Sequence, residues 1–216
     1  MKASKNLSDL ASFLAPLDSI TASRIRSLDF LELQRPQARR HIVQFYEDDQ
    51  VIIESVSFLV ANSLSNGDSS ILIATSSHLR QIEQRLANAG FDLREFREGE
   101  RYFALDAAET LTQFMVDWPD EAKFNEIVGD LIRHAAVKST NDFVFAFGEM
   151  VALLCAANKP SAAVRLEQLW NNLAKVYRFA LWCGYPLSSF GSQPNFEAVL
   201  QICAEHSITI PAEGPF

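Results

Sequence analysis

The sequence predicts an α/β protein with three layers, in which helices cover both faces of a mostly parallel sheet. Short apolar runs recur along the chain, and segments with helical spacing of apolar residues lie between them. Such alternation is typical of parallel sheets built from right-handed crossovers. Residues 143–154 show the pattern most clearly, because the run FVFAF ends at Gly148-Glu149 before an apolar helical segment. A run without polar alternation indicates a strand buried on both faces, so we expect it at the centre of the sheet.

The other expected strands are similar runs, rich in β-branched and aromatic residues. The six strands are expected at residues 41–46, 71–75, 101–105, 143–147, 179–185 and 208–210. The turn Asn66-Gly67-Asp68 precedes the second strand, and Pro186 closes the fifth.

The expected helices begin after residues that can cap them. They cover residues 47–64, 78–89, 106–115, 121–137, a short segment after residue 149, 161–177 and 196–206. Ser76 and Ser77 can cap the second helix, Gly90 can end it, and Asp106 can cap the third. Residues 188–194 are expected to form a loop.

The chain length of 216 residues fits one domain with a small appendage. We expect an N-terminal helical extension over residues 1–38 and the main domain over residues 39–216. Leu7, Leu10 and Leu14 have helical spacing, and Pro36 within a basic run marks the boundary. The extension either packs on the domain or mediates association, and packing is the preferred interpretation because an apolar stripe must be buried.

The charge balance excludes several kinds of partner. The formal net charge is −8, whereas nucleic-acid-binding surfaces are usually basic, so we expect no direct contact with nucleic acid. The same charge disfavours anionic membranes, and no apolar run is long enough to span a bilayer. The first ten residues lack the apolar core of a secretory signal, so a cytoplasmic location is expected.

Cys155, Cys183 and Cys203 are widely spaced and form no CxxC pair or other metal-ligand spacing. We interpret them as small core residues and expect no metal site.

A phosphate-binding loop is missing after the first strand. Proteins of this class that bind nucleotides place glycines there, so that backbone N–H groups can hold a phosphate. This chain has Glu47, Asp48 and Asp49 at that position, and their charges would repel a phosphate. A cation could bind there, but a well-capped helix is the preferred interpretation.

Glu149 follows the expected central strand, where open α/β sheets bind their ligands. It could equally cap the next helix. Tyr46, Thr75 and Tyr185 are expected to line the same edge of the sheet as Glu149. A pocket there with aromatic walls would suit a small organic ligand, although the same residues could form a filled edge without a ligand. Arg165 or Glu167 could pair with Glu149 or the acidic cluster, although a surface ion pair is the default expectation. The candidate ligand contacts are Tyr46, Glu47, Asp48, Thr75, Glu149, Arg165 and Tyr185.

Several segments together resemble the MEDS family, a sensory domain found in a dichloromethane-responsive regulator and in proteins of methanogens and methylotrophs. They are HIVQFYEDD (41–49), GDSSILIAT (67–75), RYFALDAAETLTQFMVDWPD (101–120), FAFGEMVALL (145–154), RLEQLWNNLA (165–174) and CGYP (183–186). The resemblance covers residues 39–190. It implies a RecA/KaiC-like fold without a P-loop.

The resemblance also implies a non-catalytic sensory or signalling domain without a cofactor. Members of the family are suggested to detect small molecules such as hydrocarbon derivatives. With no room for a kinase core, this chain would signal through another protein, a histidine kinase or a transcription regulator, and we expect a homo-oligomer, most simply a dimer. One alternative is an interaction module without a small ligand. The least favoured alternative is an atypical ATPase that uses Glu149 as a general base.

Overall fold

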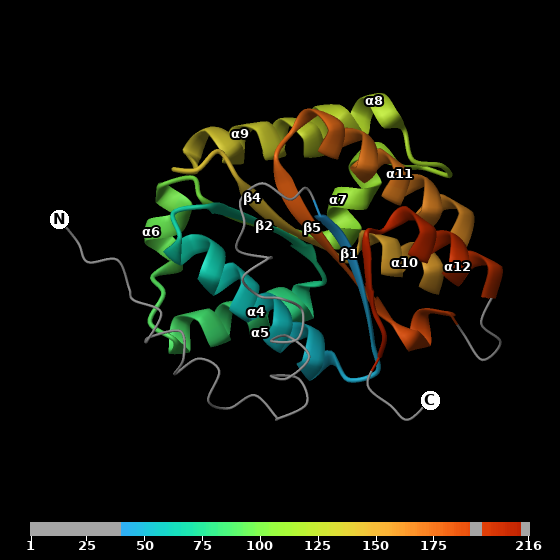
Figure 1. Ribbon diagram of the computed structural model, residues 1–216, viewed down its shortest axis with the longest axis horizontal. Helices are drawn as coiled ribbons and strands as arrows, with labels where there is room; N and C mark the ends of the chain where they lie inside the picture. The colour runs from blue at the N-terminus through green and yellow to red at the C-terminus, as the bar shows by residue number, and fades with distance from the viewer. Residues whose placement is uncertain (1–39, 191–195, 213–216) are drawn as a thin grey trace.

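The computed structural model describes residues 40–190 and 196–212, and these residues form a six-stranded sheet between two layers of helices (Figure 1). All neighbouring strands are parallel, in the order β3-β2-β4-β5-β1-β6. The strands are β1 (Arg40–Tyr46), β2 (Ser69–Ala74), β3 (Tyr102–Asp106), β4 (Val144–Gly148), β5 (Phe179–Pro186) and β6 (Ile208–Ile210). The predicted α/β class and all six predicted strands are confirmed. The predicted extension over residues 1–38 lies outside the described residues.

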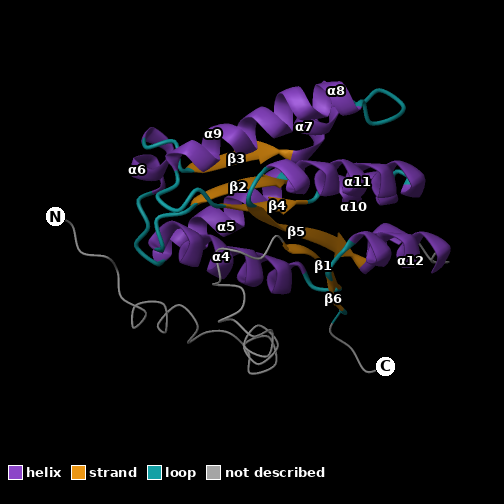
Figure 2. Ribbon diagram, turned by 45° about the horizontal axis from the view of Figure 1, so that its top comes forward, coloured by secondary structure: helices purple, strands orange, loops and turns teal. Residues whose placement is uncertain are grey.

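The helices divide between the two faces of the sheet (Figure 2). One face carries α4 (Asp49–Ser65), α5 (Ser76–Asn88) and α6 (Leu93–Glu98). The other face carries α7 (Ala107–Phe114), α8 (Glu121–Phe124), a π-helical turn (Asn125–Gly129), α9 (Asp130–Lys138), α10 (Met150–Ala156), α11 (Pro160–Val176) and α12 (Phe196–Glu205). In the described part of the chain, no helix is long and apolar enough to cross a membrane.

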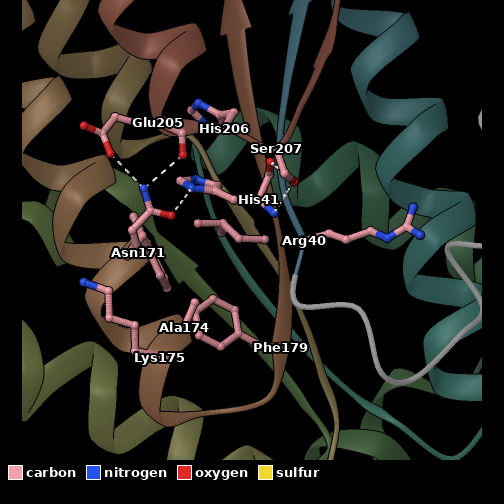
Figure 3. Close-up of a pocket in the computed structure, with 11 residues that line it drawn as sticks. Arg40, His41, Asn171, Ala174, Lys175, Phe179, Glu205, His206 and Ser207 are labelled. Carbon is pink, nitrogen blue, oxygen red and sulfur yellow. Dashed lines mark hydrogen bonds between the residues drawn. The ribbon is translucent and has the colours of Figure 1, made fainter.

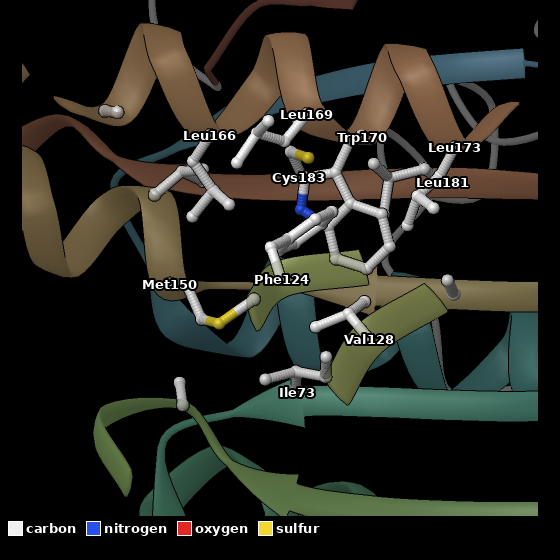
Figure 4. Packing of buried hydrophobic residues seen from close by; sticks show 14 of the residues in the cluster. Ile73, Phe124, Val128, Met150, Leu166, Leu169, Trp170, Leu173, Leu181 and Cys183 are labelled. Atoms are coloured by element: carbon white, nitrogen blue, oxygen red, sulfur yellow. The ribbon is translucent and has the colours of Figure 1, made fainter. Parts of the chain in front are cut away.

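Strand β4 shows why the apolar runs predict a doubly covered sheet. Its side chains alternate between the faces: Val144 and Ala146 join the core under α9–α11, whereas Phe145 and Phe147 join the core under α4. Aromatic rings fill the larger core, where Phe124 contacts both Phe114 and Trp170 edge to face at centroid distances of 5.3 Å (Figure 4).

Three local predictions need correction. Helix α5 begins at Ser76, and its cap is Thr75, whose hydroxyl accepts the N–H of His78 at 3.4 Å. The helix predicted over residues 121–137 is interrupted by the π-helical turn. Helix α6 was not predicted because it buries only Leu93, and the loop predicted from residue 188 begins with a 3₁₀ turn (Leu187–Phe190).

The aromatic cluster generates a stability prediction. Phe124→Ala should lower the free energy of unfolding by about 3–5 kcal/mol, because it leaves a cavity beside Trp170. Phe196, which is 75% exposed on α12, provides a matched control, and Phe196→Ala should change stability by less than about 0.5 kcal/mol. Urea denaturation measures both values, and equal effects would contradict the assigned packing.

Candidate functional site

Glu149 lies at the carboxyl end of β4, as predicted, and is only 2% exposed. It occupies the N-cap position of α10, but its side chain makes no capping hydrogen bond there. Instead, its Oε2 accepts the backbone N–H of Thr75 at 2.8 Å. The carboxylate therefore joins the end of β4 to the beginning of α5, while Glu149 also occupies the cap position that the alternative interpretation gave it.

A histidine and a second carboxylate complete this cluster. Nδ1 of His78 lies 2.5 Å from Oε1 of Glu149, and its Nε2 lies 3.3 Å from Oδ2 of Asp49. Both ring nitrogens face carboxylates, an arrangement that favours the doubly protonated imidazolium. Burial by itself would lower the pKa of His78, but the hydrogen bonds and charges of Glu149 and Asp49 outweigh it and raise that pKa.

The cluster contains three of the seven predicted ligand contacts, namely Glu149, Tyr46 and Thr75. Tyr46 donates its hydroxyl hydrogen to Oε1 of Glu149 at 3.4 Å, and Thr75 supplies the N–H already described. Asp48 caps α4, since its Oδ1 accepts the N–H of Gln50 at 2.9 Å, which confirms the capped-helix interpretation. Glu47 is exposed.

The remaining two predicted contacts, Tyr185 and Arg165, lie outside the Glu149 cluster. In the parallel pairing of β1 with β5, Tyr185 is opposite Phe45 rather than Tyr46. Successive side chains alternate between faces, so Tyr185 points to the opposite side of the sheet from Tyr46. Arg165 pairs with Glu121 at 2.7 Å and does not reach Glu149. The prediction that Tyr185 and Arg165 lie beside Glu149 is therefore wrong.

Tyr185 belongs to a second cluster, centred on Glu167 of α11. The Glu167 side chain is 0% exposed, so the expected surface ion pair is confirmed for Arg165 with Glu121 but is wrong for Glu167. Oε1 of Glu167 accepts the Tyr185 hydroxyl at 2.7 Å, and its Oε2 lies 3.0 Å from Nε2 of His41 and 3.4 Å from Sγ of Cys183. Nε2 of His206 lies 3.5 Å from Oε1. Burial alone would raise the pKa of Glu167, but the neighbouring His206 and His41 rings and the hydrogen bond from Tyr185 lower it to about 2.

Hydrogen bonds fix both histidine rings of this cluster. Asn171 donates from Nδ2 to the backbone oxygen and to Oε2 of Glu205, both at 2.9 Å, so its Oδ1 faces His41 as an acceptor. Nδ1 of His41 therefore donates to Asn171 at 2.9 Å, and Nδ1 of His206 donates to the carbonyl of Ile202 at 2.6 Å. Both Nε2 atoms are left facing Glu167.

His41, Glu167, Cys183 and His206 each offer one ligand atom, and these atoms lie within 4.8 Å of one another. Residues of these types hold transition metals. Cys183 therefore lies beside three other potential ligands, which the spacing of the cysteines in the sequence did not indicate. Local spacing could not indicate this group, because β1, α11, β5 and the segment after α12 each supply one member.

A cavity of about 380 Å³ adjoins this second cluster, between α11, the first residues of β1 and β5, and the α12–β6 connection (Figure 3). Trp170, Ala174, Phe179 and Leu181 form its apolar walls. The remaining lining residues are polar: Arg40, His41, Asn171, Lys175, Glu205, His206 and Ser207. The cavity lies toward the amino ends of the strands, whereas the Glu149 cluster lies at their carboxyl ends.

The architecture is that of a three-layer α/β domain with a wholly parallel sheet. The family model of the MEDS domain, the methanogen/methylotroph, DcmR sensory domain, matches residues 40–206. The chain therefore belongs to the MEDS family of sensory domains. No curated protein matches the chain.

The Glu149 cluster predicts a pH-dependent contribution to stability. Because folding raises the pKa of His78 above its ordinary value of 6.5, its ion pairs stabilise the fold fully below that pH. This stabilisation is lost as the pH rises through the higher pKa of the folded state. The difference in unfolding free energy between the wild type and His78→Gln should therefore shrink above about pH 6.5, as measured by urea denaturation across the range.

Two glutamate variants sharpen this prediction. Glu149→Gln should lower stability at low pH by about 1–3 kcal/mol, because it weakens a buried charged hydrogen bond. It should also reduce the pH dependence of the unfolding free energy that His78 produces in the wild type. Glu126→Gln removes one exposed charge from the π-helical turn and should leave that dependence unchanged. A pH dependence that survives in both His78→Gln and Glu149→Gln would contradict the assignment.

Proposed function

We propose that this MEDS domain is a non-catalytic sensor that binds a small organic molecule in the cavity between α11, β1 and the α12–β6 connection. The single observation that carries the proposal is the cavity itself. Its volume of about 380 Å³ falls within the range of small-molecule sites, and apolar walls with a few convergent polar groups are typical of such sites.

The lining indicates the chemistry of the ligand. Trp170, Phe179 and Leu181 offer apolar contact, so the body of the ligand is a compact organic group. Asn171 and His41 already hydrogen-bond each other, so they offer an oriented polar rim rather than an unpaired charge. A ligand with one polar end fits this lining better than a highly charged nucleotide does.

Signalling would follow from the place of the cavity in the fold. Ligand binding can shift an equilibrium only when the ligand contacts one state better than another. Glu205, His206 and Ser207 connect α12 to the edge strand β6 and also line the cavity, so occupancy would bias the position of α12. Phe196 and Leu200 of α12 are 75% and 70% exposed and lie one turn apart. This helix is our proposed contact for a signalling partner, such as a histidine kinase or transcription regulator, or for a second copy of the chain.

A specific observation favours the alternative of an interaction module without a small ligand. Val116 and Trp118 are 85% and 53% exposed in the connection between α7 and α8, which projects from the body of the domain beside α8 (Figure 2). Exposed apolar side chains of this kind occur at protein interfaces. This alternative predicts that no organic molecule binds in the cavity.

Native mass spectrometry of the full chain, followed by a thermal-shift screen of small organic compounds, tests the proposed ligand site. We expect a co-purified molecule or a screened compound that raises the melting temperature by roughly 5–10 °C near saturation. Ala174→Phe should fill the cavity and weaken binding by at least about 10-fold, since the ligand and the ring would occupy the same volume. Ala87→Phe, at an exposed position of α5 on the other face, is the matched control and should bind normally.

Equal binding by the Ala174→Phe and Ala87→Phe variants would show that the ligand lies elsewhere. A wild-type chain that carries no molecule and responds to no compound would contradict the sensor proposal and favour the interaction module.

A further inference from the structure

His206 presents an unpartnered nitrogen to the interior of the domain. Its side chain is 0% exposed, and its Nε2 has no hydrogen-bond partner among the described residues. The carbonyl of Ile202 can only accept, so the hydrogen on Nδ1 is fixed and Nε2 of the neutral ring carries a lone pair. That lone pair faces Oε1 of Glu167 at 3.5 Å. Two electron-rich atoms facing each other in a core are unfavourable unless a proton or a cation lies between them.

His41 approaches the same carboxylate in the same way. Because Nδ1 donates to Asn171, Nε2 is the atom left for the cluster. It lies 3.0 Å from Oε2 of Glu167 and 3.4 Å from Sγ of Cys183. Two imidazole nitrogens, a thiol and a carboxylate thus converge on one point from four separate segments of the chain.

We propose that His41, Glu167, Cys183 and His206 form a binding site for a divalent transition-metal ion of the zinc type. Zinc bonds of about 2.0–2.3 Å in a tetrahedron place neighbouring ligand atoms about 3.3–3.7 Å apart. Nε2 of His41, Sγ of Cys183 and Oε2 of Glu167 lie 3.0–3.4 Å from one another, and Nε2 of His206 lies 3.5 Å from the other oxygen, Oε1. The four ligand atoms lie within 4.8 Å of one another, so side-chain shifts of about 1 Å would admit the ion. A thiolate and two imidazoles select zinc, cobalt or a related metal over calcium and magnesium, which prefer oxygen ligands.

The surroundings of the four ligands support the same assignment. Metal-bound histidines characteristically donate their second ring N–H to a carbonyl or carboxylate, which fixes the ring orientation. His41 donates to Asn171 and His206 donates to Ile202 in this manner. Tyr185 donates to Oε1 of Glu167 and would orient the carboxylate. The ligands are therefore held in position by groups that would not themselves bind the ion.

Charge balance also permits metal binding in this buried place. Without metal, one proton on His41 would neutralise the carboxylate of Glu167, with Cys183 as a thiol and His206 neutral. With a divalent ion, Glu167 and Cys183 are both anionic and both histidines are neutral, so the net charge is again zero. Binding of one ion therefore displaces two protons, one from Nε2 of His41 and one from Sγ of Cys183. No uncompensated charge is buried in either state.

This inference does not rest on the proposed ligand cavity, although His41 and His206 line both sites. The two proposals fail separately. Metal content and metal spectra report on the ligand set, whereas Ala174→Phe changes the cavity without removing a metal ligand.

The test uses the full chain, stripped with a chelator and then titrated with Co²⁺ and with Zn²⁺. We expect one Co²⁺ per chain, with an intense near-ultraviolet absorption from thiolate-to-cobalt charge transfer, and displacement of this ion by Zn²⁺. Zinc uptake in weak buffer should release two protons per ion, measured with a pH indicator. Cys183→Ser should abolish the thiolate absorption and weaken zinc binding by more than about 100-fold, since loss of an outer-shell partner alone costs 10–100-fold.

Cys155→Ser provides the matched control, because Cys155 is also a buried cysteine of this core and is not one of the four ligands. It should retain the absorption and the zinc affinity of the wild type. If Cys183→Ser does not fold, as judged by circular dichroism, His206→Gln serves instead and should weaken zinc binding while keeping the thiolate absorption. Substoichiometric uptake by the wild type, or equal affinity of the ligand variant and the Cys155→Ser control, would overturn the proposal.

Discussion

Glu167 places a negative charge inside the domain, and much of the surrounding structure serves to compensate it. An isolated buried carboxylate costs several kcal/mol, so its partners must be brought close. His41 on β1, Cys183 and Tyr185 on β5, and His206 after α12 all reach Glu167 on α11. Four segments from distant parts of the chain therefore meet at this buried carboxylate.

On the other face of the sheet, a second buried carboxylate is also paired with a histidine. Glu149 and His78 join β4 to α5, and Asp49 at the start of α4 contacts the second ring nitrogen of His78. This cluster lies at the carboxyl edge, where α/β proteins usually bind ligands, yet its carboxylate is already satisfied by Thr75 and His78. The cavity instead adjoins the Glu167 cluster through His41 and His206, which is why the proposed sensory site lies beside α11 and α12.

The sequence predicted those features that depend on local patterns. Each strand appears in the sequence as an apolar run, even the half-buried strands β3 and β6, so all six could be found from hydrophobicity alone. The polar clusters depend on tertiary structure and could not. Glu149 was found because it follows the central strand, whereas Glu167 resembles any acidic residue on a helix. The face on which Tyr185 lies required the register between β1 and β5, and His41 and His206 are isolated in the sequence. The relation to RecA and KaiC stays a prediction.

The most direct test of this account is nuclear magnetic resonance of the histidine ring nitrogens in the chelator-treated full chain at neutral pH. The structure predicts that His206 is neutral with its hydrogen on Nδ1, and that His41 carries hydrogens on both ring nitrogens beside an ionised Glu167. Replacing Glu167 with Gln should lower the pKa of His41, because its main partner loses its charge. A His206 ring with its hydrogen on Nε2, or a neutral His41, would contradict the arrangement on which the proposed metal site depends.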